Sequence, residues 1–246
     1  LVGFPRSGTT LLDTILRSHR EIEVIEEKPL ITNIENFIRN ELNKDIFDFV
    51  ELDINEIKEI RKKYFSLTKN HIKGNSKLVI DKLPLNTVPI PLIVNIFPEA
   101  KIIFTCRNPY DTVLSCFQQF FEPNVAMANF ANIDDSAILY NLVMSSWKIY
   151  QKEYNFQYFY SKYEDLLEDF NSQVNKILNF LELDWDDEIV NYQSTAFKRG
   201  RINTPSSSQV IQPLYKSSIA KWKNYDKYFK NAKEYLDPWL DYFDYK

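Results

Sequence analysis

The feature that most constrains the fold is a glycine-containing loop near the start of the chain, Gly-Phe-Pro-Arg-Ser-Gly-Thr-Thr at residues 3–10. An apolar pair precedes the loop, and residues 11–16 after it carry apolar side chains at helical spacing. The order is therefore strand, tight loop and helix. Loop amides, the helix N-terminus and nearby hydroxyls then converge on one point, which predicts a phosphate site. Because two of the four glycines in the chain, Gly3 and Gly8, lie in this loop, a turn without a ligand is disfavoured.

The loop differs from that of nucleoside triphosphatases at one decisive position. The pattern of that loop is G-x-x-x-x-G-K-[ST], and Thr9 stands here where the lysine is expected. Without this lysine, a clamp on β- and γ-phosphates with magnesium chemistry is poorly supported. Arg6 lies inside the loop instead, and its forked guanidinium suits an oxyanion. We therefore predict a loop that holds one terminal phosphate, with Arg6 directed towards a neighbouring anionic group.

Five short strands are predicted, with helices between them, at residues 1–4, 22–25, 78–80, 102–106 and 158–161. This alternation predicts an α/β fold of the P-loop type with three layers, in which a mainly parallel five-stranded sheet is flanked by helices. We expect a single domain over residues 1–246. Because Leu1 already lies in the first strand, we also expect an upstream segment.

Two helices and the tail have patterns that predict how they pack. Residues 55–70 form a polar, lysine-rich segment that is expected to be solvated on one side. Residues 222–246 are rich in aromatic side chains and are predicted to dock on the body of the domain. Residues 137–150 form an amphipathic helix whose predicted apolar stripe is Leu139, Leu142, Val143 and Trp147.

The composition excludes several classes of function. With a net charge of −4 and no basic face, the chain is not expected to bind nucleic acid. No run of 18 apolar residues occurs, so no transmembrane helix is expected. Cys106 and Cys116 are interpreted as small apolar residues in a reducing compartment, which favours a cytoplasmic location and no zinc site. His19 and His71 are interpreted as ordinary surface residues, too few and too distant for a metal site or a catalytic triad.

The segment Gly-Phe-Pro-Arg-Ser-Gly-Thr-Thr-Leu-Leu resembles the 5′-phosphosulfate loop of sulfotransferases that use 3′-phosphoadenosine 5′-phosphosulfate (PAPS). The most similar branch contains the tyrosylprotein sulfotransferases and bacterial sulfotransferases with tetratricopeptide repeats. The resemblance implies PAPS as co-substrate and no metal, since sulfate carries less charge than a γ-phosphate and basic groups can replace magnesium. It implies that the 5′-phosphate is bound by Arg6, Ser7, Gly8, Thr9 and Thr10.

A second motif, Arg-Asn-Pro-Tyr-Asp-Thr-Val-Leu-Ser at residues 107–115, follows the fourth predicted strand. Ligands bind at the carboxyl edge of open α/β sheets, and a guanidinium there with a hydroxyl nearby suits a phosphate. The sulfotransferase family has R-[ND]-P-x-D-x-x-x-S at this place. The resemblance implies that Arg107 and Ser115 bind the 3′-phosphate.

Carboxylates and a lysine follow two further strands. A carboxylate near the reacting sulfuryl group could take the proton from an acceptor hydroxyl. In tyrosylprotein sulfotransferases the base is the second glutamate of a Gly-Glu-Glu segment, 21 residues after the loop arginine. The resemblance therefore implies that Glu27, 21 residues after Arg6, is the base. Ile25 stands in place of the glycine. Because neighbouring strand residues point to opposite faces, only one of Glu26 and Glu27 is expected to face the acceptor. Lys82, in an Asp-Lys-Leu-Pro segment, matches the family lysine that stabilises the leaving group.

The last matched motif lies near the C-terminus. Tyrosylprotein sulfotransferases have a catalytic serine 15 residues before a cofactor-binding lysine, and Ser206 and Lys221 reproduce this spacing. Ser207 and Ser208 adjoin Ser206, so which of the three is the active-site serine stays open. Tyr163 matches a family tyrosine near the nucleotide, with a tyrosine packed at a strand end as the equally weighted alternative.

Two positions depart from the family pattern. The arginine that reads acidic peptide substrates is Pro29 here, and an arginine of the nucleotide site is Gln119. The acceptor therefore stays open between a peptide tyrosine, a glycan, a lipid and a small alcohol. The resemblance also allows an upstream tetratricopeptide-repeat segment. The alternatives are a P-loop nucleotide kinase, disfavoured by the missing lysine, and a non-catalytic nucleotide-binding module, which would not need Glu27.

Overall fold

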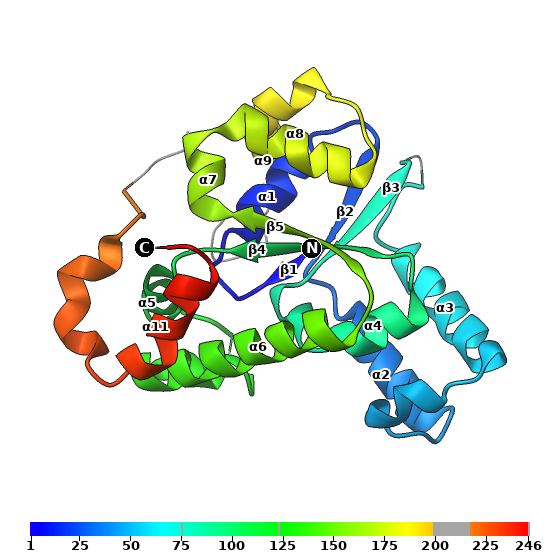
Figure 1. Cartoon of the computed structure of the whole chain (residues 1–246). Coiled ribbons are helices and arrows are strands. Elements are labelled where there is room, and N and C mark those ends of the chain that lie inside the picture. The colour runs from blue at the N-terminus through cyan, green and yellow to red at the C-terminus, as the bar shows by residue number, and fades with distance from the viewer. Residues whose placement is uncertain (75, 123, 199–216, 246) are drawn as a thin grey trace.

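The computed structural model of the chain describes residues 1–74, 76–122, 124–198 and 217–245 (Figure 1). The strands in these ranges are β1 (Val2–Gly3), β2 (Ile22–Glu26), β3 (Leu78–Lys82), β4 (Lys101–Cys106) and β5 (Gln157–Lys162). Both ends of each strand lie within two residues of the predicted ends. All pairings between them are parallel, so the α/β prediction is confirmed.

The strands form two sheets rather than the single predicted sheet. The order is β1-β4-β5 in one sheet and β2-β3 in the other. The free edge of β1 is occupied by a side chain: the Thr87 hydroxyl accepts a hydrogen bond from Gly3 N–H at 3.0 Å and lies 2.9 Å from the Gly3 carbonyl oxygen. Because β1 is only two residues long, this one hydroxyl takes the place of a further strand ladder.

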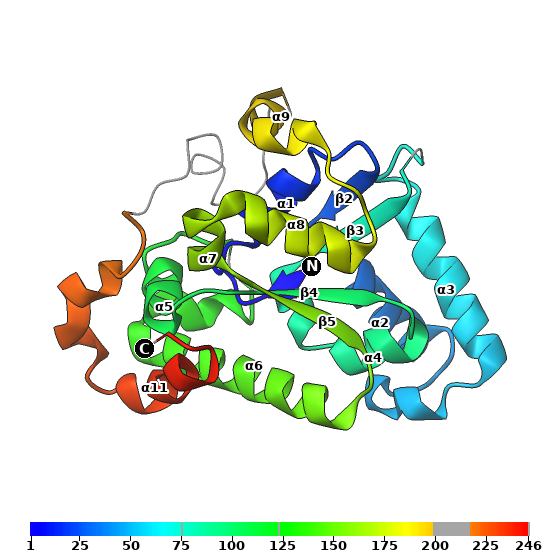
Figure 2. The same ribbon diagram turned by 45° about the horizontal axis from the view of Figure 1, so that its top comes forward.

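Helices lie on both sides of these strands. The α-helices are α1 (Thr9–Leu16), α2 (Leu30–Asn40), α3 (Ile54–Thr68), α4 (Ile90–Ile96), α5 (Pro109–Phe117), α6 (Ile133–Glu153), α7 (Tyr163–Glu168), α8 (Phe170–Leu181), α9 (Tyr192–Lys198) and α11 (Lys233–Tyr242). The 3₁₀ helices are η1 (Ile46–Glu51), η2 (Pro84–Thr87), η3 (Met127–Ala131), η4 (Asp187–Asn191) and η5 (Lys221–Phe229). Figures 1 and 2 show α1, α8 and α9 on one side of β4 and β5, and α6 and α11 on the other, so the three layers are present.

Side chains of β4 alternate between the two layers, as a strand covered on both faces requires. Ile102, Phe104 and Cys106 belong to the core cluster that includes α5, α6 and α11. Ile103 belongs to the cluster that includes α1 and α8. The Phe104 ring stacks on the Trp147 ring of α6 with a centroid distance of 4.3 Å. The helix layers are therefore fixed on a buried strand whose carboxyl end leads into the second motif.

The inner face of α6 differs from the predicted stripe. Leu142 is 57% exposed, so its assignment to the core was wrong. Val143 and Trp147 are buried as predicted, and Ala137, Tyr140 and Met144 are buried beside them. The Tyr140 ring meets the Phe4 ring edge-on at 5.0 Å, an aromatic contact between α6 and the loop after β1.

The C-terminal tail docks on the body, as predicted. Leu236, Trp239 and Phe243 are buried in the same cluster as α6.

Cys106 and Cys116 are buried free thiols, and burial raises the pKa of the Cys106 thiol to about 12.

His19 is buried, so its interpretation as a surface residue was wrong. Its ring lies between two backbone groups, with Nε2 3.0 Å from the Asp184 carbonyl oxygen and Nδ1 3.0 Å from Glu21 N–H. Among the described helices, none is long and apolar enough to cross a membrane.

Candidate functional site

The predicted phosphate loop forms the connection between β1 and α1. Ser7 N–H donates to the Phe4 carbonyl oxygen at 3.1 Å, which closes a tight turn. Gly8 has a φ of 103°, in the region that favours glycine, and a Cβ atom at this position would lie 2.8 Å from Cδ2 of Tyr163. Gly8 is therefore needed both for the turn and for the close approach of Tyr163.

The loop is tied to β4, and its end forms the first turn of α1. The Ser7 and Thr105 hydroxyl oxygens lie 2.8 Å apart in the interior. Thr9 and Thr10 are buried at the start of α1. The first amides of a helix have no partner inside the helix, and together with the helix dipole they suit an anion.

Five predicted residues from four separate segments line one cavity of about 320 Å³: Arg6, Arg107, Ser115, Tyr163 and Lys221. Arg6 Nε donates to Ser115 Oγ at 3.0 Å, and Arg107 Nη1 donates to the Arg6 carbonyl oxygen at 3.3 Å. The Arg107 guanidinium lies 5.0 Å from the centre of the Tyr163 ring. The residues that line the cavity are Arg6, Arg107, Asp111, Leu114, Ser115, Gln118, Gln119, Tyr163, Ser217, Ser218 and Lys221.

Arg107 is a buried cation with hydrogen-bonding capacity to spare. Its hydrogen bonds to described residues go to the carbonyl oxygens of Arg6 and Ser218, the latter at 2.8 Å. Its Nε is buried and makes no hydrogen bond within the described ranges. Burying a charge and an unsatisfied N–H is costly, so this position favours an anionic ligand such as a phosphate.

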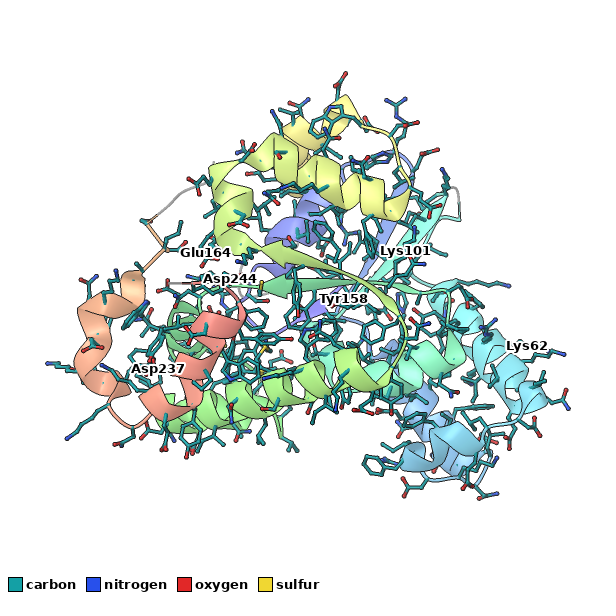
Figure 3. All side chains as sticks on the ribbon, viewed as in Figure 1. Lys62, Lys101, Tyr158, Glu164, Asp237 and Asp244 are labelled. Atoms are coloured by element: carbon teal, nitrogen blue, oxygen red, sulfur yellow. The ribbon has the colours of Figure 1, made fainter. Side chains whose placement is uncertain are left out.

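Two residues to which the sequence analysis assigned no role lie next to Arg107: Asn108 follows it in the chain, and Glu164 contacts the Asn108 backbone. The Asn108 side chain caps α5 by accepting a hydrogen bond from Tyr110 N–H at 3.1 Å. Glu164 accepts hydrogen bonds from Asn108 N–H at 3.0 Å and from the Tyr245 hydroxyl at 2.9 Å. Figure 3 shows Glu164 at the start of α7 beside the C-terminal end of the chain. Burial raises the pKa of Glu164 above its usual range.

A segment over residues 217–222 closes one side of the cavity. The Tyr163 hydroxyl lies 3.0 Å from Ser218 Oγ. The Asp111 carboxylate accepts hydrogen bonds from Ala220 N–H at 2.6 Å and Trp222 N–H at 2.9 Å. Burial raises the pKa of Asp111, while these amides counteract the shift. Asp111 was missed as a site residue, and the signal for it was its place in the R-N-P-x-D pattern.

Lys221, predicted to bind the nucleotide, lines the cavity from this segment. Its Nζ donates to Gln118 Oε1 of the segment after α5 at 2.9 Å. The next residue, Trp222, stacks on the buried Tyr110 ring at 4.3 Å. Tyr110 also donates from its hydroxyl to Asp237, which Figure 3 shows on α11. The C-terminal layer therefore supports the cavity through Tyr110.

A second group of charged residues lies at the carboxyl ends of β2 and β3. Lys82 is fully buried, and its Nζ donates to Glu27 Oε1 at 2.7 Å. Nζ also lies 3.6 Å from Glu26 Oε1 and 3.8 Å from Asp13 Oδ2. The Asp13 carboxylate in turn accepts hydrogen bonds from Arg17 at 2.7 and 2.9 Å. One buried ammonium is thus surrounded by three carboxylates.

The prediction that the side chains of Glu26 and Glu27 point to opposite faces is wrong. Both carboxylates lie within 4 Å of Lys82 Nζ. The reason is that β2 ends at Glu26, and Glu27 adopts a φ of 48°, which breaks the alternation of a strand. Glu27 N–H still donates to the Lys82 carbonyl oxygen at 2.7 Å. The side chain of Glu27 is 29% exposed and that of Glu26 only 6% exposed.

The predicted site residues therefore fall into two groups joined by α1. Arg6, Arg107, Ser115, Tyr163 and Lys221 line the cavity, whereas Lys82 and Glu27 do not. Asp13 on α1 contacts Lys82, and the N-terminal turn of the same helix completes the phosphate loop.

Ser206 lies outside the described residues. In the described ranges, no group of three or more histidine, cysteine, aspartate or glutamate side chains is placed to hold a metal ion.

Known proteins resemble this chain over most of its length. A protein from Aquifex aeolicus (strain VF5), described as uncharacterized, is 30% identical over 96% of this chain, and protein-tyrosine sulfotransferase A of Caenorhabditis elegans is 24% identical over 89%. The chain spans only 32% and 59% of the length of these relatives. The crystal structure of mouse sulfotransferase SULT7A1 complexed with PAP has the same fold, with a TM-score of 0.55, 18% identity, and coverage of 97% of this chain and 82% of that one.

A family model described as "Sulfotransferase family" matches residues 1–187. The match contains the phosphate loop, both glutamates, Lys82, Arg107, Ser115 and Tyr163, and it covers well over half of the 246 residues. The chain therefore belongs to the sulfotransferase family.

Proposed function

We propose that this chain transfers the sulfuryl group of PAPS to an acceptor hydroxyl. The observation that carries the proposal is the convergence of Arg6, Ser115 and Arg107 on one cavity beside the phosphate loop. Two guanidinium groups from distant segments suit two separate phosphate groups. PAPS presents two, a 5′-phosphosulfate and a 3′-phosphate. The PAP complex of the mouse sulfotransferase supports this choice of donor.

Each group of residues has a task in this proposal. Arg107 and Ser115 bind the 3′-phosphate, and Tyr163 and Lys221 line the nucleotide site. The 5′-phosphate is held by Arg6, Ser7, Gly8, Thr9 and Thr10, where the helix N-terminus favours negative charge.

The reaction is an in-line displacement at sulfur. A bond forms from the acceptor oxygen to sulfur while the bond from sulfur to the 5′-phosphate oxygen breaks. The leaving group, 3′-phosphoadenosine 5′-phosphate (PAP), takes the electron pair of the broken bond. Glu27, the more exposed of the two glutamates, takes the proton of the acceptor hydroxyl. Lys82 and Arg6 stabilise the negative charge that develops on the leaving group and the sulfuryl oxygens. The family resemblance assigns Ser206 to the same task.

The test is mass spectrometry of acceptors incubated with PAPS and this chain, using peptide tyrosines, glycans, lipids and small alcohols. We expect a product that is heavier by one sulfuryl group, together with release of PAP. Binding of PAP without sulfation of any acceptor would favour the nucleotide-binding module. Phosphorylated products from ATP would favour the kinase.

The role of Glu27 is tested with Glu27→Gln, which keeps the shape of the side chain but cannot take a proton. Loss of a general base lowers kcat by roughly 10²- to 10⁴-fold, and we expect little change in KM for PAPS. Glu26→Gln is the matched control, since both carboxylates lie near Lys82. An inactive Glu26→Gln with an active Glu27→Gln would show that the base has been assigned to the wrong carboxylate.

A further inference from the structure

Asp13 is a fully buried carboxylate that contacts two cations from different elements. It lies on α1, among apolar and hydroxyl side chains, and is 0% exposed. Its Oδ1 accepts hydrogen bonds from Arg17 Nε at 2.9 Å and Nη2 at 2.7 Å. Its Oδ2 lies 3.8 Å from Lys82 Nζ at the end of β3. A buried carboxylate is tolerated only when it is paired, and here the pairing links the phosphate-loop helix to the lysine.

We propose that Asp13 is a positioning residue for Lys82, which holds the ammonium at a fixed place relative to the phosphate loop. Arg17 fixes the carboxylate from the same helix, one turn further on. Because α1 begins at the loop, a lysine held by Asp13 is also held relative to a phosphate bound there. The inference rests on the proposed function, in which Lys82 stabilises the leaving group.

The charges around Lys82 explain why Glu27 alone would not be enough. Glu27 makes the 2.7 Å hydrogen bond to Lys82, but in the proposed reaction it takes a proton and loses its charge in every turnover. A fully buried ammonium that loses its counter-charge is destabilised. Asp13 and Glu26 take no part in this proton transfer, and their carboxylates lie 3.8 and 3.6 Å from Nζ. Of these two, Asp13 is fully buried and fixed by Arg17, so it keeps Lys82 in place while the leaving group departs.

The first experiment is a double-mutant cycle between Asp13→Asn and Lys82→Met, with kcat and KM for PAPS as the measured quantities. Misplacement of a catalytic group lowers rates by on the order of 10- to 100-fold. We expect Asp13→Asn to lower kcat by this amount with little change in KM. In the Lys82→Met background the same substitution should change kcat by less than about twofold, because the effects of coupled residues are not additive. An equal loss of kcat in both backgrounds would mean that Asp13 acts independently of Lys82, and would overturn the proposal.

A second measurement does not depend on activity. Protein labelled with ¹⁵N-lysine is examined by NMR for the side-chain ammonium signal that Lys82→Met removes. Asp13→Asn should shift or broaden this signal. The control is Asp186→Asn, which removes another buried aspartate paired with an arginine, Arg20, and should leave the signal unchanged. An unchanged Lys82 signal in Asp13→Asn would refute the positioning role.

These two measurements separate the inference from the proposed function. If no sulfuryl transfer is found but the Lys82 signal responds to Asp13→Asn, the contact is real and the proposed function is wrong. If transfer is found and the cycle is additive, the proposed function stands and the role of Asp13 is wrong. Should Asp13→Asn not fold, Arg17→Met leaves the carboxylate but releases it. We then expect a smaller loss of kcat that again disappears in the Lys82→Met background.

Discussion

At the scale of single residues, the close approach of Gly8 to Tyr163 is a packing requirement of the loop between β1 and α1, and it can be measured. We expect Gly8→Ala to destabilise the fold through both its φ of 103° and the 2.8 Å contact with Tyr163. The matched control is Gly74→Ala, because Gly74 has a φ of 80° but no atom within 4 Å of an added Cβ. The left-handed conformation costs roughly 1–2 kcal/mol in either variant, and overpacking adds about 1–3 kcal/mol for Gly8 alone.

The free energy of unfolding in urea is the measurement for both glycine variants. Equal losses would show that Tyr163 moves aside without cost, and that its position does not depend on Gly8. A larger loss in Gly8→Ala would support a Tyr163 ring held in place by the loop.

The residues that could be predicted from the sequence are those with a local pattern. Arg6 and Arg107 were found because a phosphate loop and a strand end have recognisable neighbours in the chain. Asp13 was not, because a single aspartate in a helix is typical of a solvated surface. Asp111 was part of the quoted R-N-P-x-D pattern, but no role was assigned to it. Their partners are remote in sequence: Asp111 accepts a hydrogen bond from an amide 109 residues away. Only the fold shows such contacts.

At the scale of secondary-structure elements, Asp186 joins the turn after α1 to the start of η4. It accepts hydrogen bonds from Arg20 N–H and Nε, both at 2.9 Å, and from Glu188 N–H at 3.1 Å. The hydrogen bond from the Arg20 guanidinium, with those from the backbone amides, holds the pKa of Asp186 well below its usual range. In acid the unfolded chain therefore binds a proton at this residue before the folded protein does.

The sign of the pH dependence follows from this depressed pKa. The contribution of Asp186 to stability is complete above about pH 4, the ordinary pKa of an aspartate, and is lost as the pH falls below it. We expect Asp186→Asn to cost on the order of 1.5–3 kcal/mol near neutral pH, as for hydrogen bonds to a charged group. Unfolding free energies of the two proteins should converge on acidification. A difference that stays constant down to about pH 2 would contradict a depressed pKa.

Elements were predicted better than their arrangement. All five strands were found because each is a short apolar run, whereas their division into two sheets was not, and the Thr87 hydroxyl lies at the edge of β1 where a single sheet would continue. The pattern of hydrophobic residues placed Leu142 in the core with Val143 and Trp147, but Leu142 is exposed and Tyr140, in contact with Phe4, is buried. In both cases the arrangement involves tertiary contacts that no local pattern reveals.

At the scale of the whole molecule, the three layers bring distant parts of the chain to one cavity of about 320 Å³. The phosphate loop and the second motif come from the ends of adjacent parallel strands, β1 and β4. The segment 217–222 is held against them by Asp111, Arg107 and Tyr163. The C-terminal layer supports that segment through the Tyr110 ring. The cavity is therefore lined by residues from the N-terminal, central and C-terminal parts of the chain, and the proposed binding of PAPS would involve all three.

The most direct measurement is calorimetric titration of the chain with PAP, adenosine 5′-phosphate and ATP with magnesium, repeated with Arg107→Ala. One molecule of PAP should bind per chain. Its affinity should exceed that of adenosine 5′-phosphate by roughly 10- to 100-fold, because a hydrogen bond to a charged group contributes about 1.5–3 kcal/mol. Arg107→Ala should remove this preference, and ATP with magnesium should bind most weakly. Equal affinities of the unaltered protein for PAP and adenosine 5′-phosphate, or tighter binding of ATP with magnesium, would contradict a site built for a 3′,5′-bisphosphate nucleotide.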